Sequence, residues 1–420
     1  MKPLIGLVLS GGGARGAYEA GVVHFIRTAL PQKDIRFDII TGTSVGAINA
    51  CFLAATADDP QLQGREIRRL WETLSPSRIY KTGALSIGKA LLQTIKHDLL
   101  GWIKERRRDE AVPFTFYKSL QDTSPLHEFL GREIPWQNIP QNMKKGVLGA
   151  LALSTTDIRT GQLVIFLEKT SPLAYIGTPD AVKTTITETH AMASAAIPIL
   201  FPPIEVDGAY YCDGGLRQTT PISPAVALGA EKVLIIALRY SPLQQKPVKK
   251  AVPPSLGHIV GKVFNSIFLD HLEYDLTMMK RMNRIIDWST KLYGPQYLEE
   301  LNKAIAQDDI LKHIPRRGIR KIEELTLYPS ADIGSMAADF VRRNGFKMEL
   351  ALWHRMFFKA TQAGQETESD LLSYLLFDPA YLKELFELGY EDARRQKDKL
   401  IQFFEEEVLV GKIRRGETVL

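Results

Sequence analysis

This 420-residue chain has little cysteine, no long hydrophobic run and only a small excess of positive charge. Its two cysteines, Cys51 and Cys212, are too few for a disulfide framework or a cysteine-based zinc site, so a reducing compartment is the simpler expectation. No stretch reaches the about eighteen apolar residues that a membrane-spanning helix needs. The net charge of +5 is too weak for a nucleic-acid-binding signature, but it is compatible with docking on anionic lipid.

The composition is that of a folded protein with a sizeable core. Hydrophobic residues make up 45% of the chain and charged residues 24%, which excludes general disorder. The apolar run at 4–9 is too short for a signal peptide and stops at a serine and three glycines, so we interpret it as the first strand. We therefore expect a cytoplasmic protein or one peripheral on the membrane, while export without a cleaved leader stays open.

The first half of the chain alternates strand-like and helix-like segments. Helical periodicity is present at 17–29 and 45–55. Strand–helix alternation predicts an α/β fold with a mainly parallel central sheet flanked by helices. The strand-like segments, which are rich in Val, Ile and Leu, are residues 4–9, 38–40, 147–153, 163–167 and 233–238.

We expect residues 1–240 to form the core, with a helical insertion at about 60–135. Inside it, apolar residues at helical spacing over 91–103 precede the basic run 104–108. Packing over the core is favoured there over a helix lying on a membrane surface. A proline-containing polar stretch after 240 marks a boundary. Residues 241–420 are expected to be mostly helical and packed on or extending the core, with one more strand at 325–328.

A glycine-rich segment, residues 11–16 (GGGARG), follows the first expected strand and opens a helix. Glycines let the backbone approach a ligand closely, and main-chain N–H groups at a helix N-terminus bind negative charge. The segment also fits the G-x-G-x-x-G pattern of dinucleotide-binding folds, which need an acidic residue at the end of the second strand. Here Asp38 begins that strand instead, so the cofactor interpretation is disfavoured.

A second turn, residues 42–46 (GTSVG), also joins an expected strand to an expected helix. In G-x-S-x-G the small flanking residues allow a strained turn that exposes the serine oxygen as a nucleophile. The alternative is a plain glycine-rich turn in which Ser44 caps the helix. The strand and the helix lie on the sides that the nucleophile interpretation requires.

A nucleophilic serine needs a base, and the histidines offer no clear one. None of the eight lies in a loop after a late strand, where an ordinary α/β-hydrolase places its triad histidine; His190, before an expected short helix, stays open. Asp213 is the carboxylate that stands out, because it ends a strand-like segment and enters a glycine turn. Turn chemistry alone also explains an Asp-Gly pair.

Two further patterns are rejected. Residues 83–89 (GALSIGK) fit the start of a P-loop, but Ala90 replaces the Ser or Thr that holds Mg²⁺ and no strand precedes the segment. There is also no Asp- and Asn-rich calcium loop. We therefore expect neither nucleotide hydrolysis nor a metal site.

Taken together, residues 11–16, 42–46 and 213–215, in this order, resemble the patatin-like phospholipase family. The run 193–203 (ASAAIPILFPP) is also similar to that family. The resemblance covers roughly residues 4–240 and extends weakly to 332–334 and 388–390. Each motif is modest alone, but their joint order and their strand–turn–helix context are specific.

The resemblance implies a patatin-like three-layer α/β/α fold and a Ser–Asp dyad that works without histidine. Ser44 would be the nucleophile and Asp213 its base, and an apolar pocket would raise the proton affinity of Asp213. Arg15 would support the glycine loop or its bound anion. No metal and no cofactor would take part. The oxyanion hole would be formed by the backbone amides of Gly11, Gly12 and Gly13.

The function expected on this basis is a lipid acyl hydrolase of the phospholipase A or lysophospholipase type. Its partners would be membrane phospholipid or lysophospholipid at a peripheral membrane surface, with no nucleic acid, and a protein activator stays open. One alternative is a non-catalytic lipid- or nucleotide-binding module in which Ser44 is inert. Another is an acyltransferase that uses the same serine, because an alcohol can capture an acyl-serine in place of water.

Overall fold

The computed structural model describes most of the chain in several stretches. The helix expected at 91–103 with its basic end, and the P-loop-like residues 83–89, lie outside the described residues. So do parts of the mostly helical region expected at 241–420. The described residues are 3–31, 35–81, 122–170, 173, 175, 181–198, 200–240, 272–307, 318–344 and 372–405.

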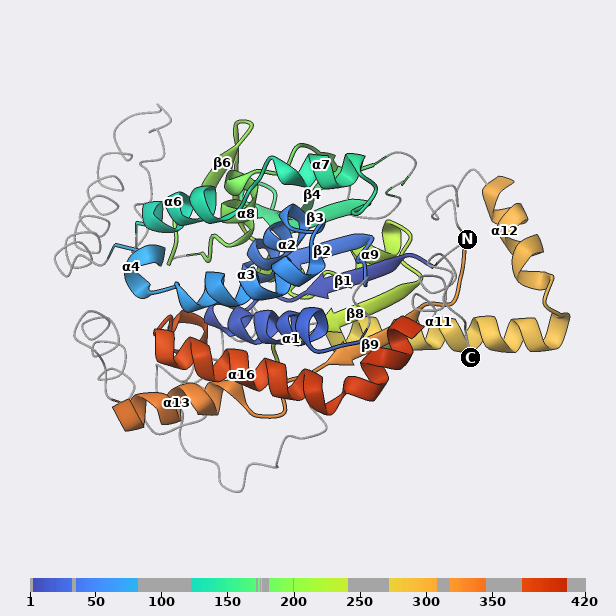
Figure 1. Ribbon diagram of the computed structural model, residues 1–420. Coiled ribbons are helices and arrows are strands. Elements are labelled where there is room, and N and C mark those ends of the chain that lie inside the picture. Colours follow the sequence, from blue (N-terminus) through green and yellow to red (C-terminus); the bar gives the residue numbers. More distant parts are fainter. Residues whose placement is uncertain are drawn as a thin grey trace, which may run out of the picture.

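A mixed, mainly parallel sheet forms the centre of the molecule (Figure 1). Its strand order is β5-β4-β3-β2-β1-β8-β9, with β7 added to β3 and β6 added to β7. Strands β3, β2, β1, β8 and β9 run parallel, whereas β4 and β7 are antiparallel to β3. The strands are β1 (Ile5–Leu9), β2 (Ile39–Thr43), β3 (Ala150–Asp157), β4 (Leu163–Lys169), β5 (Ala181–Lys183), β6 (Ile204–Val206), β7 (Ala209–Asp213), β8 (Lys232–Ile236) and β9 (Glu323–Leu327).

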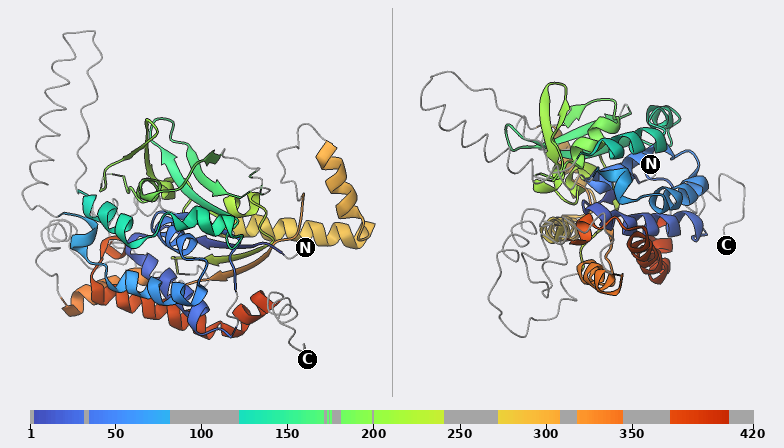
Figure 2. Two further views of the ribbon diagram at one scale, coloured as in Figure 1. Left: turned by 45° about the horizontal axis from the view of Figure 1, so that its top comes forward. Right: turned by 90° about the vertical axis from the view of Figure 1, so that its left-hand side faces the viewer.

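Helices cover both faces of this sheet, which confirms the predicted fold class (Figures 1 and 2). None of the described helices is both long and apolar enough to cross a bilayer. The helices used below are α1 (Gly16–Thr28), α2 (Val45–Ala55), α3 (Pro60–Glu72), α4 (Pro76–Ile79), α6 (Ser124–Glu133), α7 (Asn138–Lys144), α8 (Glu188–Ser194), α9 (Ile222–Ala227), α11 (Leu272–Tyr293), α12 (Tyr297–Gln307), α13 (Ile333–Asn344) and α16 (Pro379–Arg395).

The central strands are apolar on both faces, as a sheet covered by two helical layers requires. In β8, Leu234 and Ile236 point into the core formed with α1, α2 and α16, whereas Val233 and Ile235 point into the core formed with α9 and α11. Because successive side chains alternate between the two faces of the sheet, each strand contributes side chains to both cores. The result is a three-layer α/β/α arrangement.

The C-terminal part of the chain adds to both the sheet and one helical layer. Strand β9 pairs in parallel with β8, as the apolar run at 325–328 predicts. Helix α16 lies against α1 (Figure 1). A Cβ atom on Gly21 would overlap the carbonyl oxygen of Phe386, and one on Gly389 would overlap that of Tyr18. The two glycines therefore let the backbones of α1 and α16 approach unusually closely.

The strand register places the segments singled out in the sequence at one edge of the sheet. Leu9, the last residue of β1, lies beside Gly42 of β2, and Thr43 lies beside Ser154 of β3. Beyond the end of β2, on the same side of β3, Thr155 pairs with Asp213 of β7. Ligands of open α/β sheets bind outside the carboxyl ends of the strands, and this is where Ser44 and Asp213 meet.

Candidate active site

Ser44 sits on a strained turn between β2 and α2. It has φ +56° and ψ −126°, a conformation that residues other than glycine rarely adopt. A Cβ on Gly42 would overlap the backbone of Gly46, and one on Gly46 would overlap the carbonyl oxygen of Leu9. No side chain fits at either flanking position, so both residues must be glycine. The side chain of Ser44 makes no capping hydrogen bond to α2, contrary to the helix-cap interpretation of this turn.

The hydroxyl of Ser44 instead meets Asp213 across the sheet edge. Its Oγ donates a hydrogen bond to Oδ2 of Asp213 at 2.6 Å, although the two residues lie 169 positions apart in the sequence. The other carboxyl oxygen, Oδ1, accepts from the backbone amide of Gly215 at 2.7 Å. The side chain of Asp213 is fully buried. The carboxyl group is thus fixed, with one oxygen held by the glycine turn and the other facing the serine.

Burial brings the pKa of this carboxyl group close to neutral pH. Loss of water raises the pKa of Asp213 to about 7, and the hydrogen bonds from Ser44 and Gly215 oppose this rise only in part. An ordinary aspartate is too weak a base to deprotonate a serine efficiently. A carboxylate with a pKa close to the working pH combines an adequate ionised fraction with a useful proton affinity.

Two successive hydrogen bonds through a serine that we did not predict also hold the turn at Ser44. The backbone amide of Ser44 donates to Oγ of Ser194 at 2.9 Å, and that hydroxyl donates to the carbonyl oxygen of Ser154 at 2.7 Å. Both Ser154 and Ser194 are buried. Ser194 lies in the run 193–203 that resembles the patatin-like family, but a lone serine in an alanine-rich segment carries no chemical pattern that would single it out.

The glycine loop lies directly beside Ser44. A Cβ on Gly11 would come within 3.2 Å of the Cβ of Ser44. The amide of Gly11 donates to the carbonyl oxygen of Thr219 at 2.9 Å, so it is already used in a main-chain hydrogen bond. No hydrogen bond is found for the amides of Gly12 and Gly13 within the described part of the chain. Of the three amides expected at an oxyanion hole, these two remain for a ligand.

Arg15 is buried behind the glycine loop. Its Nε donates to Oγ of Ser373 at 2.8 Å, and its Nη1 donates to the carbonyl oxygen of Leu238 at 3.3 Å. The guanidinium group also lies over the ring of Tyr374, 4.3 Å from its centre. These contacts tie the loop to the end of β8 and to the segment before α16. Of the two expected roles for Arg15, support of the loop and contact with a bound anion, they fit the first.

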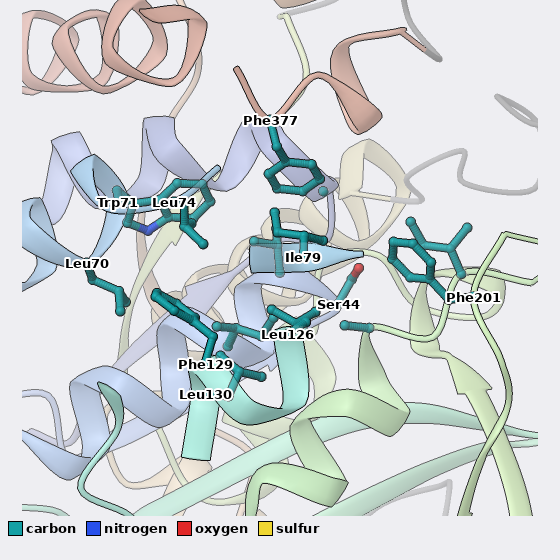
Figure 3. Close-up of a pocket in the computed structure, with 15 residues that line it drawn as sticks. Ser44, Leu70, Trp71, Leu74, Ile79, Leu126, Phe129, Leu130, Phe201 and Phe377 are labelled. Atoms are coloured by element: carbon teal, nitrogen blue, oxygen red, sulfur yellow. The ribbon is translucent and has the colours of Figure 1, made fainter. Parts of the chain in front are cut away.

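An apolar pocket opens at Ser44 (Figure 3). Its empty space, including open solvent at the mouth, is about 580 Å³. Apart from Ser44 and Gly13, every lining residue is apolar. The walls come from α3, α4 and α6, from residues after α8 and from the end before α16: Leu70, Trp71, Leu74, Ile79, Leu126, Phe129, Leu130, Ala195, Ile197, Phe201 and Phe377, with Val45 and Ile48 of α2.

A buried polar chain anchors one wall of this pocket. The indole N–H of Trp71 donates to Oδ1 of Asn49, whose amide group donates to Glu19. Glu19 also accepts from the backbone amide of Ser10, just before the glycine loop. Burial raises the pKa of the Glu19 carboxyl well above its usual value. This series of hydrogen bonds connects the pocket wall to the end of β1.

His190 has a structural place instead of a catalytic one. Its Nδ1 accepts a hydrogen bond from the amide of Thr187 at the start of α8 and lies 2.9 Å from that residue's hydroxyl oxygen. Its ring packs edge-on against Phe166. Among the described residues, no group of three or more His, Cys, Asp or Glu side chains is arranged to hold a metal ion.

Comparison with known proteins gives a family and several partial relatives. The family model described as "Patatin-like phospholipase" matches residues 7–226. A "cGAMP-activated phospholipase" of Pseudomonas aeruginosa (strain BWHPSA011 / Pa011) is 29% identical over 219 residues, 51% of this chain and 53% of that protein. "Lysophospholipase nte1" of Aspergillus terreus (strain NIH 2624 / FGSC A1156) is 48% identical over 61 residues, 14% of this chain and 4% of that protein. The chain thus spans about half or less of the length of these relatives.

Among solved structures, human GIVD cytosolic phospholipase A2 in complex with methyl gamma-linolenyl fluorophosphonate is similar at a TM-score of 0.41 and 12% identity. The match covers 96% of this chain and 59% of that one. VipD from Legionella pneumophila matches at a TM-score of 0.30 and 12% identity, over 99% of this chain and 78% of that one.

Proposed function

The chain belongs to the patatin-like phospholipase family, and from this we propose that it is a lipid acyl hydrolase that cleaves fatty acyl esters through an acyl intermediate on Ser44. The observation that carries the proposal is the 2.6 Å hydrogen bond from the Ser44 hydroxyl to the buried carboxyl group of Asp213, at the opening of an apolar pocket. A serine nucleophile, a tuned base and an acyl-chain site are the parts that ester cleavage needs.

In the first half of the reaction, Ser44 Oγ attacks the ester carbonyl carbon while Asp213 takes its proton. The tetrahedral intermediate collapses, the bond from carbon to the leaving alcohol breaks, and Asp213 returns the proton to that alcohol. In the second half, Asp213 removes a proton from water, which attacks the acyl-serine and releases a fatty acid and free Ser44. A pKa of about 7 suits a group that accepts and returns a proton twice per cycle.

The amides of Gly12 and Gly13 are the proposed oxyanion donors. Negative charge builds on the carbonyl oxygen in both halves of the reaction, and one rigid donor aimed at it is worth about 3–4 kcal/mol. The amide of Gly11 is given a structural task here, because it already donates to Thr219. The glycines also remove the side chains that would otherwise separate the loop from the substrate.

The proposed substrate is a membrane phospholipid or lysophospholipid whose acyl chain enters the pocket. Each methylene group that moves from water to an apolar wall contributes about 0.8 kcal/mol, so an acyl chain can bind to these walls without any polar contact. Several relatives are named phospholipases or lysophospholipases, which supports this substrate class. We place the reaction at a membrane surface, where such lipids are found.

Release of fatty acid from phospholipid vesicles tests the proposal. The wild-type protein should release free fatty acid and leave a lysolipid, whereas Ser44→Ala should release none above background. An arm with cGAMP is included because one relative is named as activated by it. An added glycerol or lysolipid acceptor separates hydrolysis from acyl transfer. Equal release by wild type and Ser44→Ala, or none in any arm, would exclude the proposed activity.

A further inference from the structure

The segment 372–377, which we call the C-terminal strut, touches the glycine loop although it lies far beyond residues 7–226 that the family model matches. Ser373 is fully buried, and its Oγ accepts the hydrogen bond from Nε of Arg15. The ring of Tyr374 supports the guanidinium group of the same arginine at 4.3 Å. Arg15 is therefore held by a hydrogen bond and by a cation–π contact, both from the strut.

The strut also contacts the loop backbone directly. Gly13 has φ +56°, and a Cβ there would overlap the carbonyl oxygen of Tyr374. The loop therefore has no room to move towards the strut, while Thr219 holds the amide of Gly11 at its other end. The amides of Gly12 and Gly13 lie between these two fixed points.

From these contacts we infer that the C-terminal strut positions the oxyanion hole. Ser373 and Tyr374 hold the side chain of Arg15, and the backbone of Tyr374 prevents Gly13 from moving towards the strut. Together these contacts fix the amides of Gly12 and Gly13 relative to Ser44. They are positioning residues, because they act through the loop and not on the substrate. The inference rests on the proposed acyl hydrolase function.

The same strut also reaches the acyl-chain pocket. Phe377 lines it together with Ser44 and Gly13 (Figure 3). A single short segment thus borders both the group that would bind the oxyanion and the wall that would bind the acyl chain. Displacement of the strut should therefore disturb turnover and chain binding together, whereas a change at Ser373 alone should affect turnover.

Ser373→Ala tests the positioning role. Misplacement of catalytic groups by about 1 Å costs on the order of a hundredfold in rate, so kcat on a short soluble ester should fall about ten- to hundredfold. KM for such an ester should change by less than about threefold, because the variant removes a transition-state interaction. Tyr374→Leu, which removes the ring beneath Arg15, should act in the same direction. Ser335→Ala on α13 is the matched control and should behave like wild type.

Each kcat is divided by the number of active sites, titrated to completion with a fluorophosphonate, so that loss of folded protein is separated from loss of rate. A kcat per site within twofold of wild type, in whichever strut variant keeps the wild-type Tm, overturns the inference. Failure of the proposed function itself would look different, since the wild type would then not be labelled at all.

A separate surface feature is carried by α11. Its buried side is fixed to the core by Leu272, Leu276 and Ile286, and Asn283 exchanges hydrogen bonds with Ile322. The opposite side carries large apolar side chains that are 44–76% exposed, spaced three or four residues apart. They form one face of the helix. We call this face the α11 stripe: Tyr274, Met278, Met282, Ile285, Trp288 and Leu292.

We propose that the α11 stripe binds the same stripe of a second copy of this chain. The first turn of α11 is acidic (Glu273, Asp275) and its last turn carries Lys291, so antiparallel pairing of two copies brings opposite charges together. A standard interface takes about 800 Å² from each partner, and the stripe contributes six large apolar side chains that are 44–76% exposed. Both α11 and α12 extend beyond the sheet at the end where the N-terminus lies (Figures 1 and 2), so two copies can meet there.

The charges of α11 favour a second copy of the chain over a lipid surface as the partner that binds the stripe. The helix has four basic and three acidic residues, whereas helices that bind anionic membranes carry a clear basic excess on their polar face. Arg281 and Ser289 also lie within the arc of the stripe. Polar residues in such a seam fix the register of the pair.

Sedimentation velocity over a range of concentrations tests this pairing. Wild type should be a dimer, and Ile285→Glu/Trp288→Glu should be a folded monomer. Leu62→Glu, which changes an exposed leucine on α3, is the matched control and should stay dimeric. A monomeric wild type, or a dimer that persists in the double variant, overturns the proposal. Binding of the monomeric wild type to vesicles through the stripe would also overturn it.

Discussion

At the scale of single residues, the surroundings of Asp213 decide whether it can serve as the proposed base. It is fully buried, and desolvation is the largest influence on its pKa. Its carboxyl oxygens accept hydrogen bonds from the Ser44 hydroxyl and the Gly215 amide. Both favour the ionised form, which keeps the pKa near neutrality instead of far above it.

The activity should therefore depend on pH through this group. Asp213 acts as a base only when it is ionised, and its pKa is about 7. We expect kcat/KM on a soluble ester to rise about tenfold per pH unit well below 7 and to level off above it. A pH–rate profile measures this. A profile that is flat between pH 5 and 8 would argue against Asp213 as the base.

The sequence singled out the residues that we propose to react, but not the groups that hold them. Ser44 and Asp213 could be predicted because each lies in a turn whose glycines leave a recognisable pattern. Ser194, Ser373 and Tyr374 carry no such pattern, since a single hydroxyl or ring becomes informative only once its partner is known. For the same reason the sequence could not show that the Gly11 amide donates to the carbonyl oxygen of Thr219, 208 positions further along the chain.

At the scale of elements, the strands were predictable where apolar residues are concentrated. All five strand-like segments of the first half overlap observed strands, as does the run at 325–328. The three-residue strands β5 and β6 have exposed positions and no periodicity that distinguishes them from loops. The domain organisation, with a core to residue 240 and a C-terminal region, remains a proposal.

The contact between α1 and α16 should tolerate no side chain at its crossing point. In Gly389→Ala the new Cβ would overlap the carbonyl oxygen of Tyr18, so the helices must separate. We expect a loss of about 1–3 kcal/mol in the free energy of unfolding, measured by denaturant titration. Gly131→Ala on α6 is the control, because its Cβ meets nothing within 4 Å. It should stabilise by up to about 1 kcal/mol, and equal effects of both variants would refute the packing argument.

At the scale of the whole molecule, the pocket is made by segments that only folding brings together. Its walls come from α3, α4, α6, the residues after α8 and Phe377. No local pattern predicts such a combination, because it depends on how each helix packs on the sheet. From the sequence we expected an insertion packed over the core and an apolar pocket at Asp213, but we had no expectation for the residues that face Ser44.

The size of this pocket should set the chain length of the substrate. Leu70 lies at the end of the pocket away from Ser44 (Figure 3). Leu70→Trp should therefore lower kcat/KM for long-chain esters about ten- to hundredfold, at about 0.8 kcal/mol for each methylene displaced, and leave short esters within about twofold. A series of p-nitrophenyl esters measures this. Leu62→Trp, on the exposed side of the same helix, is the control, and an unchanged chain-length profile in Leu70→Trp would contradict the assignment.

The most direct test of the central claim is covalent labelling with a fluorophosphonate, followed by peptide mass mapping. The account predicts a single adduct on Ser44 in the wild type and no adduct in Ser44→Ala. Asp213→Asn should keep the wild-type Tm and be labelled about 10²–10⁴-fold more slowly, because the hydroxyl loses its base. An adduct on another residue, or labelling of Asp213→Asn at the wild-type rate, would contradict it.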